Sequence, residues 1–358
     1  MALAFGAQAH AVETTLPVAA KVQDVGVDAG GVKWHPGHYI LLYPNQKEPD
    51  NFYSAMRDLR GNPIFRGVMK LYFWNKLEPQ YGVYDFSEIR ADLTNVARIN
   101  KQLVVAIQGV SFVSNEKLVP SYLLAEEYEG GVYPIKTGKG FNIAYYNARV
   151  QDRLVALLTA LGKEFDGNPN LEAIRLQETS PSRQDPEWGR AHVTKYMAGM
   201  LKVAIATKAA FPHTVVIQYI NYPERFLPRF VDTLQSAGIG IGGPDVYQND
   251  TYLEQGAYSF YPGVSGVVPI GVSVDYNNYQ SSGGGASLDK PSIGSIFNFA
   301  VDKLEPNYMF WLRRTREPLN GSNYWQDVLD YFGKSDWQAD PAGGLNAACP
   351  KSFLKCVN

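Results

Sequence analysis

Charge of one sign, cysteine and long apolar runs are all scarce in this sequence of 358 residues. It carries 33 Lys and Arg against 35 Asp and Glu, a net charge of −2, without a dense basic run. Nucleic-acid-binding surfaces and polybasic membrane patches need clustered positive charge, so we expect neither. No apolar run approaches the roughly 18 to 20 residues that span a bilayer. With 45% apolar and 13% aromatic residues, the composition is typical of a globular protein with a large core.

The two ends of the chain carry the features that bear on location. The first residues end a small-residue stretch with Ala9-His10-Ala11, which resembles the Ala-x-Ala end of a secretory signal. An Ala-rich disordered terminus is the alternative. The only cysteines are Cys349 and Cys356, and a disulfide between them would hold the tail in place, whereas two free thiols are the alternative. A signal and a disulfide both fit an oxidising compartment, so we expect a secreted or periplasmic protein.

Short β-branched or aromatic runs alternate with segments of helical period along the whole chain. These runs predict eight strands: Tyr39–Tyr43, Phe65–Trp74, Leu103–Gly109, Ala173–Glu178, Val215–Ile220, Ile239–Tyr247, Pro269–Asp275 and Tyr308–Leu312. Ile89, Leu93, Val96 and Ala97 have the spacing of one apolar helix face, and so do the apolar residues of 150–161. Further helices are predicted at roughly 52–60, 189–210, 225–236, 292–304 and 323–332.

Eight strands with crossovers long enough for right-handed parallel connections predict a single (β/α)8 TIM barrel. The gap after the third strand is about twice as long as the others. It holds 113–143, which we interpret as an inserted loop. A doubly wound open sheet is the alternative, but no Gly-x-Gly-x-x-Gly follows an early strand. The predicted organisation is a signal remnant and extension over 1–25, the barrel over 26–340 and a disulfide-bonded tail over 341–358.

Functional side chains of a parallel barrel gather where the strands reach their carboxyl ends. The sequence offers aromatic, amide and acidic residues there. The candidates for substrate contact are His35, His38, Trp74, Gln177, Tyr219, Tyr247, Asn277 and Trp311. The candidate catalytic acids are Glu178, Asp275 and Asp245. Sugars present apolar faces that stack on rings and hydroxyls that pair with carboxylates and amides, so this set predicts a carbohydrate site.

One segment also resembles a known superfamily. The run Trp74-Asn-Lys-Leu-Glu78-Pro79-Gln-Tyr-Gly82-Val-Tyr84-Asp85-Phe86 is similar to the second βα loop of the (β/α)8 glycoside hydrolases related to cellulases, β-mannanases and β-galactosidases. The resemblance is strongest over 64–112. In that superfamily an Asn-Glu pair ending strand four supplies the acid/base, a Glu ending strand seven is the nucleophile, and a Trp ending strand eight forms the floor of a subsite. The resemblance therefore implies these roles for Gln177-Glu178 and Trp311.

The seventh strand departs from the superfamily pattern. No Glu occurs between Glu254 and Glu305, so Asp275 is the only carboxylate on that strand, and Gln177 stands where the superfamily has Asn. We predict that Glu178 protonates the leaving glycosidic oxygen, while Asp275 attacks the anomeric carbon in a retaining mechanism or activates water in an inverting one. Asp245 is the rival for either role. Neither a cofactor nor a metal is expected.

Several candidates also have a structural interpretation. Glu178 could pair with Arg175 or Arg183, and both Asp275 and Asp245 could stabilise turns. Glu78 precedes a proline, and we predict that it stabilises its loop. The histidines lack a third clustered ligand, so a metal site is not predicted. The two tryptophans could close the barrel ends instead of stacking on sugar.

Two functions from different classes follow. The first is a secreted glycoside hydrolase that cleaves β-linked poly- or oligosaccharides through a pair of carboxyl groups. The second is a non-catalytic carbohydrate-binding barrel, which the missing strand-seven Glu keeps open. A polysaccharide lyase is a weaker third option, because its cleft would need more basic residues. The expected partner is a carbohydrate, and the sequence does not determine the oligomeric state.

Overall fold

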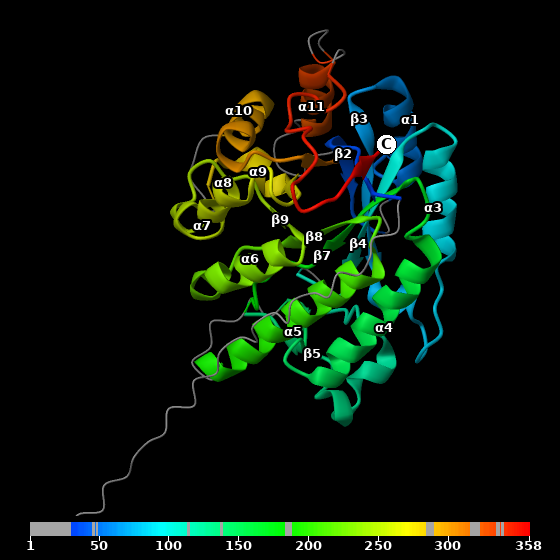
Figure 1. Ribbon diagram of the computed structural model, residues 1–358, viewed down its shortest axis with the longest axis vertical. Coiled ribbons are helices and arrows are strands. Elements are labelled where there is room, and N and C mark those ends of the chain that lie inside the picture. Colours follow the sequence, from blue (N-terminus) through cyan, green and yellow to red (C-terminus); the bar gives the residue numbers. More distant parts are fainter. Residues whose placement is uncertain are drawn as a thin grey trace, which may run out of the picture.

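A closed barrel of eight parallel strands forms the centre of the molecule (Figure 1). The computed structural model describes residues 30–44, 47, 49–112, 115–136, 139–182, 188–283, 290–315, 323–333, 337 and 340–358. The strands are β2 (Gly37–Leu42), β3 (Phe65–Phe73), β4 (Gln102–Gln108), β7 (Leu171–Leu176), β8 (Val215–Tyr219), β9 (Gly240–Gly243), β10 (Ile270–Val274) and β11 (Tyr308–Leu312). They pair in the order β10-β11-β2-β3-β4-β7-β8-β9. The predicted (β/α)8 fold and all eight predicted strands are confirmed.

Strand β9 is shorter than the predicted Ile239–Tyr247, because Pro244 follows Gly243 and proline has no N–H for the ladder. Close packing explains the glycines of β9. A Cβ at Gly242 would lie 2.8 Å from the Tyr219 ring and 1.9 Å from the Gly271 carbonyl oxygen. The bare backbone of β9 therefore leaves room for the Tyr219 ring inside the barrel.

Helices surround the barrel and cover its outer face (Figure 1). The longer ones are α1 (Phe52–Gly61), α3 (Ser87–Ala97), α4 (Ala148–Phe165), α5 (Arg190–Ala210), α6 (Leu227–Ser236), α10 (Ile293–Phe299), which continues as a π-helical turn (Ala300–Leu304), and α11 (Tyr324–Phe332). All predicted helices are present. The short helices α2 (Trp74–Leu77), α7 (Thr251–Gln255), α8 (Tyr261–Val264) and α9 (Tyr276–Gln280) were not predicted, because four or five residues are too few to show a period.

The long connection after β4 is an insertion, as predicted. It contains two 3₁₀ turns (Ser121–Leu124 and Glu126–Tyr128) and an antiparallel hairpin of β5 (Val132–Pro134) and β6 (Phe141–Ile143). The hairpin belongs to none of the barrel pairings. The chain then enters α4, whose N-cap Asn147 accepts hydrogen bonds from the backbone N–H groups of Arg149 and Val150.

Alternate residues of each barrel strand face opposite sides. One buried cluster contains strand and terminal residues but no helix residue, and it fills the interior: Tyr39, Leu41, Met69, Leu71, Val104, Ala106, Ala173, Val215, Ile217, Tyr219, Tyr308, Phe310 and Leu312. The intervening residues, such as Ile40, Val68, Ile174 and Met309, pack with helix residues in the outer layer. This alternation decides which side chain at a strand end points into the barrel mouth.

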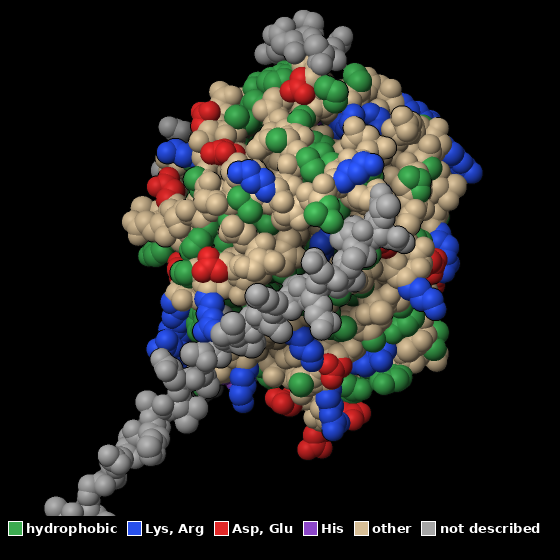
Figure 2. All heavy atoms as spheres, in the orientation of Figure 1, with side chains coloured by type: hydrophobic (Ala, Val, Ile, Leu, Met, Phe, Trp, Pro, Cys, Tyr) green, Lys and Arg blue, Asp and Glu red, His purple; other side chains and the backbone are tan. Residues whose placement is uncertain are grey.

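The carboxyl-terminal tail packs at the amino end of the barrel. Cys349 and Cys356 form the predicted disulfide. Next to it, β12 (Cys356–Val357) pairs in parallel with β1 (Val32–Lys33), just before β2. The predicted signal remnant over 1–25 lies outside the described residues. None of the described helices has the length and apolarity to cross a membrane. On the face seen in Figure 2, basic and acidic side chains are interspersed.

Candidate active site

Three acidic residues follow three strands at the carboxyl end of the barrel. Glu178 lies two residues after β7, Asp245 two residues after β9, and Asp275 directly after β10. All three are half-buried. The Asp275 carboxylate contributes to raising the pKa of both Glu178 and Asp245, so the three groups share one electrostatic environment. The barrel thus brings together the three acids that the sequence proposed.

Glu178 is oriented by an amide that lies just after the neighbouring strand β8. The Asn221 Nδ2 atom donates to Glu178 Oε2 at 3.0 Å. The Asn221 Oδ1 atom accepts from the backbone N–H groups of Ser180 at 2.9 Å and Tyr222 at 2.7 Å, which assigns the two ends of the amide. Burial, with a smaller contribution from Asp275, raises the pKa of Glu178 to about 7, although Arg175 and Asn221 oppose the shift. Glu178 is therefore partly protonated near neutral pH.

Asp275 is surrounded by donors and cations. The Tyr43 hydroxyl donates to its Oδ2 atom and the Tyr276 backbone N–H to its Oδ1 atom, so Asp275 also caps helix α9. Burial raises the pKa of Asp275, while these two hydrogen bonds and the positive charges of Arg314 and Arg175 lower it. A carboxylate has about four lone-pair sites, and the two donors leave part of this capacity to a ligand. Of the three acids, Asp275 has the most contacts that favour the ionised form, although burial still raises its pKa overall.

Asp245 is the most strongly perturbed acid. Burial, followed by the charges of Asp275 and Glu178, raises its pKa to about 8. The Asn278 Nδ2 atom donates to Asp245 Oδ1 at 3.1 Å, and Asn278 Oδ1 accepts from the Asp275 backbone N–H at 2.9 Å. Asn278 therefore links the two aspartates, and Asp245 is a neutral carboxylic acid at neutral pH.

A buried arginine lies beneath the acids. The Arg175 guanidinium stacks on the Tyr219 ring at 4.6 Å, and the Tyr219 hydroxyl lies 2.6 Å from the Ser273 hydroxyl. Tyr219 thus supports the site from inside the barrel. Within the described part of the chain, the buried Arg175 Nε and Gln177 Oε1 atoms have no hydrogen-bond partner. Buried polar atoms are normally paired, so these two are available to a bound molecule.

A small cavity opens beside the acids at the ends of β8 and β9. Its volume is about 230 Å³, and Asp245, Asn221 and Tyr247 are among its lining residues. The Tyr247 backbone N–H donates to the Tyr258 hydroxyl at 2.9 Å, which fixes this wall. Burial, together with the charges of Asp245 and Asp275, raises the pKa of Tyr247, so its hydroxyl stays protonated. The cavity therefore offers hydroxyl, amide and carboxyl groups in one place.

Four predicted contact residues are not at this site: His35, His38, Trp311 and Trp74. His35 precedes β2, and both its backbone N–H and its Nδ1 atom lie 2.7 Å from carboxylate oxygens of Glu172 at the amino end. The His38 Nε2 atom lies 3.0 Å from the Gly343 carbonyl oxygen, and burial lowers the pKa of His38 to about 4. The Trp311 Nε1 atom donates to His38 Nδ1 at 2.9 Å. Trp311 alternates with the inward-facing Phe310 and Leu312, so its indole packs in the outer layer and cannot form the floor of a subsite.

Trp74 is likewise completely buried in the outer layer. Its Nε1 atom donates to Glu78 Oε2 at 3.0 Å, and Glu78 also accepts from the Gly82 backbone N–H at 3.1 Å and pairs with Arg153. The loop-stabilising role predicted for Glu78 is confirmed, and Trp74 serves the same loop and does not face a substrate. Asn277 is exposed on α9 next to Asp275, and its contact with substrate remains a prediction.

Four residues around the acids were not predicted in their observed roles. Tyr43 and Asn278 bind the aspartates, Arg175 lies beneath the acids, and Arg314 places a positive charge beside Asp275. The signal for three of them was present. Tyr43, Arg175 and Arg314 have the same strand parity as the interior residues Leu41, Ala173 and Leu312. The described residues contain no group of three or more His, Cys, Asp or Glu that could hold a metal ion.

Geometry and fold together define a (β/α)8 barrel with a polar, acid-lined mouth. The sequence matches no protein-family model and no curated protein. Solved structures share the fold at very low identity. The catalytic domain of a β-amylase from Paenibacillus polymyxa is 10% identical, with a TM-score of 0.56 and coverage of 84% of this chain and 99% of that one.

Two further structural neighbours are a β-galactosidase from Bacillus circulans sp. alkalophilus and endo-glycoceramidase II from Rhodococcus sp.. The first is 11% identical with a TM-score of 0.57, covering 87% of this chain and 55% of that one. The second is 11% identical with a TM-score of 0.51, covering 83% of this chain and 80% of that one. All three neighbours are glycoside hydrolases, and the likeness shows a common fold.

Proposed function

We propose that this protein is a secreted or periplasmic glycoside hydrolase that cleaves β-linked poly- or oligosaccharides without a cofactor. One observation carries the proposal: Glu178 and Asp275 interact at the barrel mouth, and Asp275 has more hydrogen bonds and positive charges that favour its ionised form than Glu178 has. Glycoside hydrolysis needs one carboxylic acid and one carboxylate in the same cleft. The glycosidase folds among the structural neighbours and the disulfide support the proposal.

Glu178 acts as the general acid. Its proton passes to the glycosidic oxygen as the bond between that oxygen and the anomeric carbon breaks. Asn221 holds the carboxyl group in position through the bond to Oε2. A pKa of about 7 keeps the proton available near neutral pH and still allows its transfer.

Asp275 acts on the other side of the anomeric carbon. In a retaining reaction its carboxylate bonds to that carbon, and water later displaces it with Glu178 as the base. In an inverting reaction Asp275 instead takes a proton from the attacking water. Tyr43 and Arg314 stabilise the ionised carboxylate in either case. Asp245, which is neutral at pH 7, acts as a hydrogen-bonding group toward substrate in the 230 Å³ cavity.

The second candidate function is a carbohydrate-binding barrel without catalysis. The helix-capping contact of Asp275 favours it, because a capping carboxylate has a structural role without any chemistry. In that case the same mouth binds sugar through the unpaired polar atoms of Arg175 and Gln177.

Release of reducing ends from a panel of β-linked polysaccharides separates the two candidates. We expect release by the natural protein, and a loss of more than about 100-fold in both Glu178→Gln and Asp275→Asn. Glu88→Gln and Asp152→Asn are matched controls, because both side chains are more than half exposed and neither lies among the acids of the barrel mouth. Binding of the same sugars without release by any variant would establish the non-catalytic function.

A further inference from the structure

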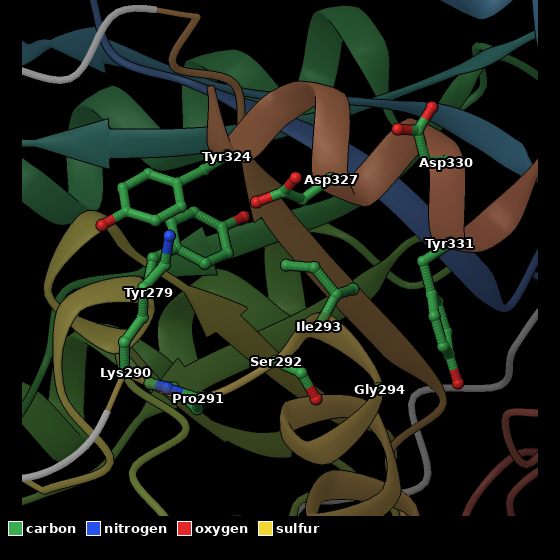
Figure 3. A pocket seen from close by; sticks show the side chains of 10 residues that line it. All are labelled: Tyr279, Lys290, Pro291, Ser292, Ile293, Gly294, Tyr324, Asp327, Asp330 and Tyr331. Atoms are coloured by element: carbon green, nitrogen blue, oxygen red, sulfur yellow. The ribbon is translucent and has the colours of Figure 1, made fainter. Parts of the chain in front are cut away.

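A second, larger cavity lies beyond the acids, between α9, residues 290–294 and α11 (Figure 3). Its volume is about 480 Å³, within the range of roughly 300 to 1,000 Å³ that is common for ligand sites. The lining residues used below are Tyr279, Lys290, Ser292, Tyr324 and Asp327. Its elements follow strands β10 and β11, so the cavity opens on the same end of the barrel as the acids.

Tyr279 provides the evidence that this cavity binds something. Its side chain is 1% exposed, it lines the cavity, and within the described part of the chain its hydroxyl has no hydrogen-bond partner. The hydroxyl lies on the Asp327 side of the cavity (Figure 3), and the Asp327 charge contributes to raising the pKa of Tyr279. A buried hydroxyl without a partner costs folding free energy, so its retention here is explained if a ligand supplies the partner.

The remaining lining groups determine the chemistry of that ligand. Asp327 offers carboxylate acceptors, whereas Ser292 and Tyr279 offer hydroxyl donors. The Lys290 ammonium lies 4.6 Å from the centre of the Tyr324 ring. Donors and acceptors side by side suit hydroxyl groups, because each hydroxyl both donates and accepts. Two carboxylates, Asp327 and Asp330, line the cavity and oppose an anionic ligand, so the expected ligand is rich in hydroxyl groups and carries no negative charge.

Aromatic contacts connect this cavity to the acids. The Arg314 guanidinium lies 4.0 Å from the centre of the Tyr276 ring, the Tyr276 and Tyr324 rings are 5.9 Å apart, and Tyr324 stacks on Tyr279 at 4.7 Å. Asp275 caps the helix that carries Tyr276 and Tyr279. At a rise of 1.5 Å per residue, the backbone of Tyr279 lies about 6 Å along the helix axis from the backbone of Asp275.

We propose that the 480 Å³ cavity is a distal subsite that binds neutral sugar units of the same oligosaccharide whose bond lies at the acids. The inference rests on the proposed function and adds a substrate class: neutral chains longer than a disaccharide. The Tyr279 hydroxyl and the Asp327 carboxylate bind the remote sugar unit. A chain that reaches both places binds more tightly than one that reaches the acids alone.

Calorimetric binding to the Glu178→Gln variant tests the subsite without requiring hydrolysis. The probes are cellobiose, mannobiose and xylobiose, the corresponding neutral hexasaccharides, and a hexamer of galacturonic acid. We expect at least one neutral hexasaccharide to bind about tenfold or more tightly than its disaccharide. Adding Tyr279→Phe or Asp327→Asn is expected to remove about tenfold of hexasaccharide affinity and to leave disaccharide affinity unchanged.

Tyr53→Phe is the matched control, because Tyr53 is 70% exposed at the start of α1 and does not line the cavity. Tyr279→Phe removes only an unpaired hydroxyl, so its melting temperature is expected to stay the same or rise, which separates lost binding from lost folding. Equal affinity for the short and long sugars, equal losses for both, preference for the acidic hexamer, or no binding at all would each overturn the subsite. If Tyr279→Phe hydrolyses hexasaccharides as fast as the natural protein does, the subsite alone is overturned. If longer sugars bind more tightly but no variant hydrolyses them, the proposed function alone is overturned.

Discussion

Glu172 and Asp166 at the amino end of the barrel have several hydrogen-bond donors each, whereas Glu178 and Asp245 at the carboxyl end have one side-chain donor each. At the amino end, Glu172 accepts three hydrogen bonds of 2.7 Å, from the backbone N–H and ring of His35 and from the Tyr308 hydroxyl. Asp166 accepts from the backbone N–H of His213 at 3.1 Å and pairs with its ring at 2.7 Å. Each acid has its own set of donors, and the result is a fixed structural end.

At the carboxyl end, Glu178 and Asp245 have fewer donors and are repelled by neighbouring carboxylates. Asn221 serves Glu178 and Asn278 serves Asp245, each through one hydrogen bond. Burial and mutual repulsion raise the pKa of both acids. Unfavourable electrostatics of this kind reduce stability and are typical of sites where protons move. The comparison supports the proposal that the carboxyl end is the reactive one.

The largest expected effect comes from replacing Glu178 at the carboxyl end. Glu178→Gln is expected to reduce sugar release more than about 100-fold, because the amide cannot donate the proton, while oligosaccharide binding stays measurable. Its melting temperature should not fall, since the change removes a destabilised acid. Undiminished release from the polysaccharide panel would contradict the assignment of Glu178 as the acid.

Glu172→Gln sharpens the same comparison from the other side. This carboxylate is completely buried, and an amide cannot accept all the bonds that His35 and Tyr308 donate. We expect a loss of about 2 to 4 kcal/mol in the free energy of unfolding, with unchanged turnover per folded molecule. Denaturant titration and a rate normalised to the folded fraction measure the two quantities. A loss of turnover without a loss of stability would remove the distinction between the ends.

The pH dependence of stability is a smaller effect with a predictable sign. The pKa of Asp245 rises from an ordinary 3.8 to about 8 on folding, so between roughly pH 4 and 8 the folded protein binds more protons than the unfolded chain. Stability therefore falls as the pH rises through this window. Asp245→Asn is expected to reduce the fall in melting temperature between pH 5 and 8, by an amount on the order of 5 °C. An equal fall in melting temperature between pH 5 and 8 in both proteins would show that folding does not raise the pKa of Asp245.

The smallest expected effect belongs to the amino end and has the opposite sign. Burial lowers the pKa of Lys33 and Lys208 from 10.5 to about 8, so above pH 8 the folded protein binds fewer protons than the unfolded chain. This contribution makes stability rise with pH. Lys208→Met is expected to remove roughly half of it between pH 8 and 9.5, as thermal melting would measure. An unchanged slope would contradict the assignment to these lysines.

The sequence predicted the barrel because strand and helix periods were strong in every unit. It also placed Glu178, Asp245 and Asp275 at one end, since strand direction alone decides that. It misplaced Trp311 and His38, because closeness to a strand end does not determine which side of the barrel wall a side chain faces. Both alternate with interior residues and therefore face the helices.

Other features were beyond the reach of sequence patterns. The bond from Tyr43 to Asp275 joins residues 232 positions apart, and only barrel closure through β2 and β11 brings them together. The cavity at Tyr279 depends on how two βα connections pack, which no local period encodes. Long-range packing of this kind is set by the whole fold.

Carboxyl ¹³C NMR titration of Glu178, in the natural protein and in Asp275→Asn, tests the central claim most directly. Asparagine keeps the cap of α9 and removes the charge. The account predicts a pKa of about 7 for Glu178 in the natural protein and a lower value in the variant, because the Asp275 charge contributes to the shift. A Glu178 pKa near 4.5 in both proteins would contradict the claim that these two acids form one site.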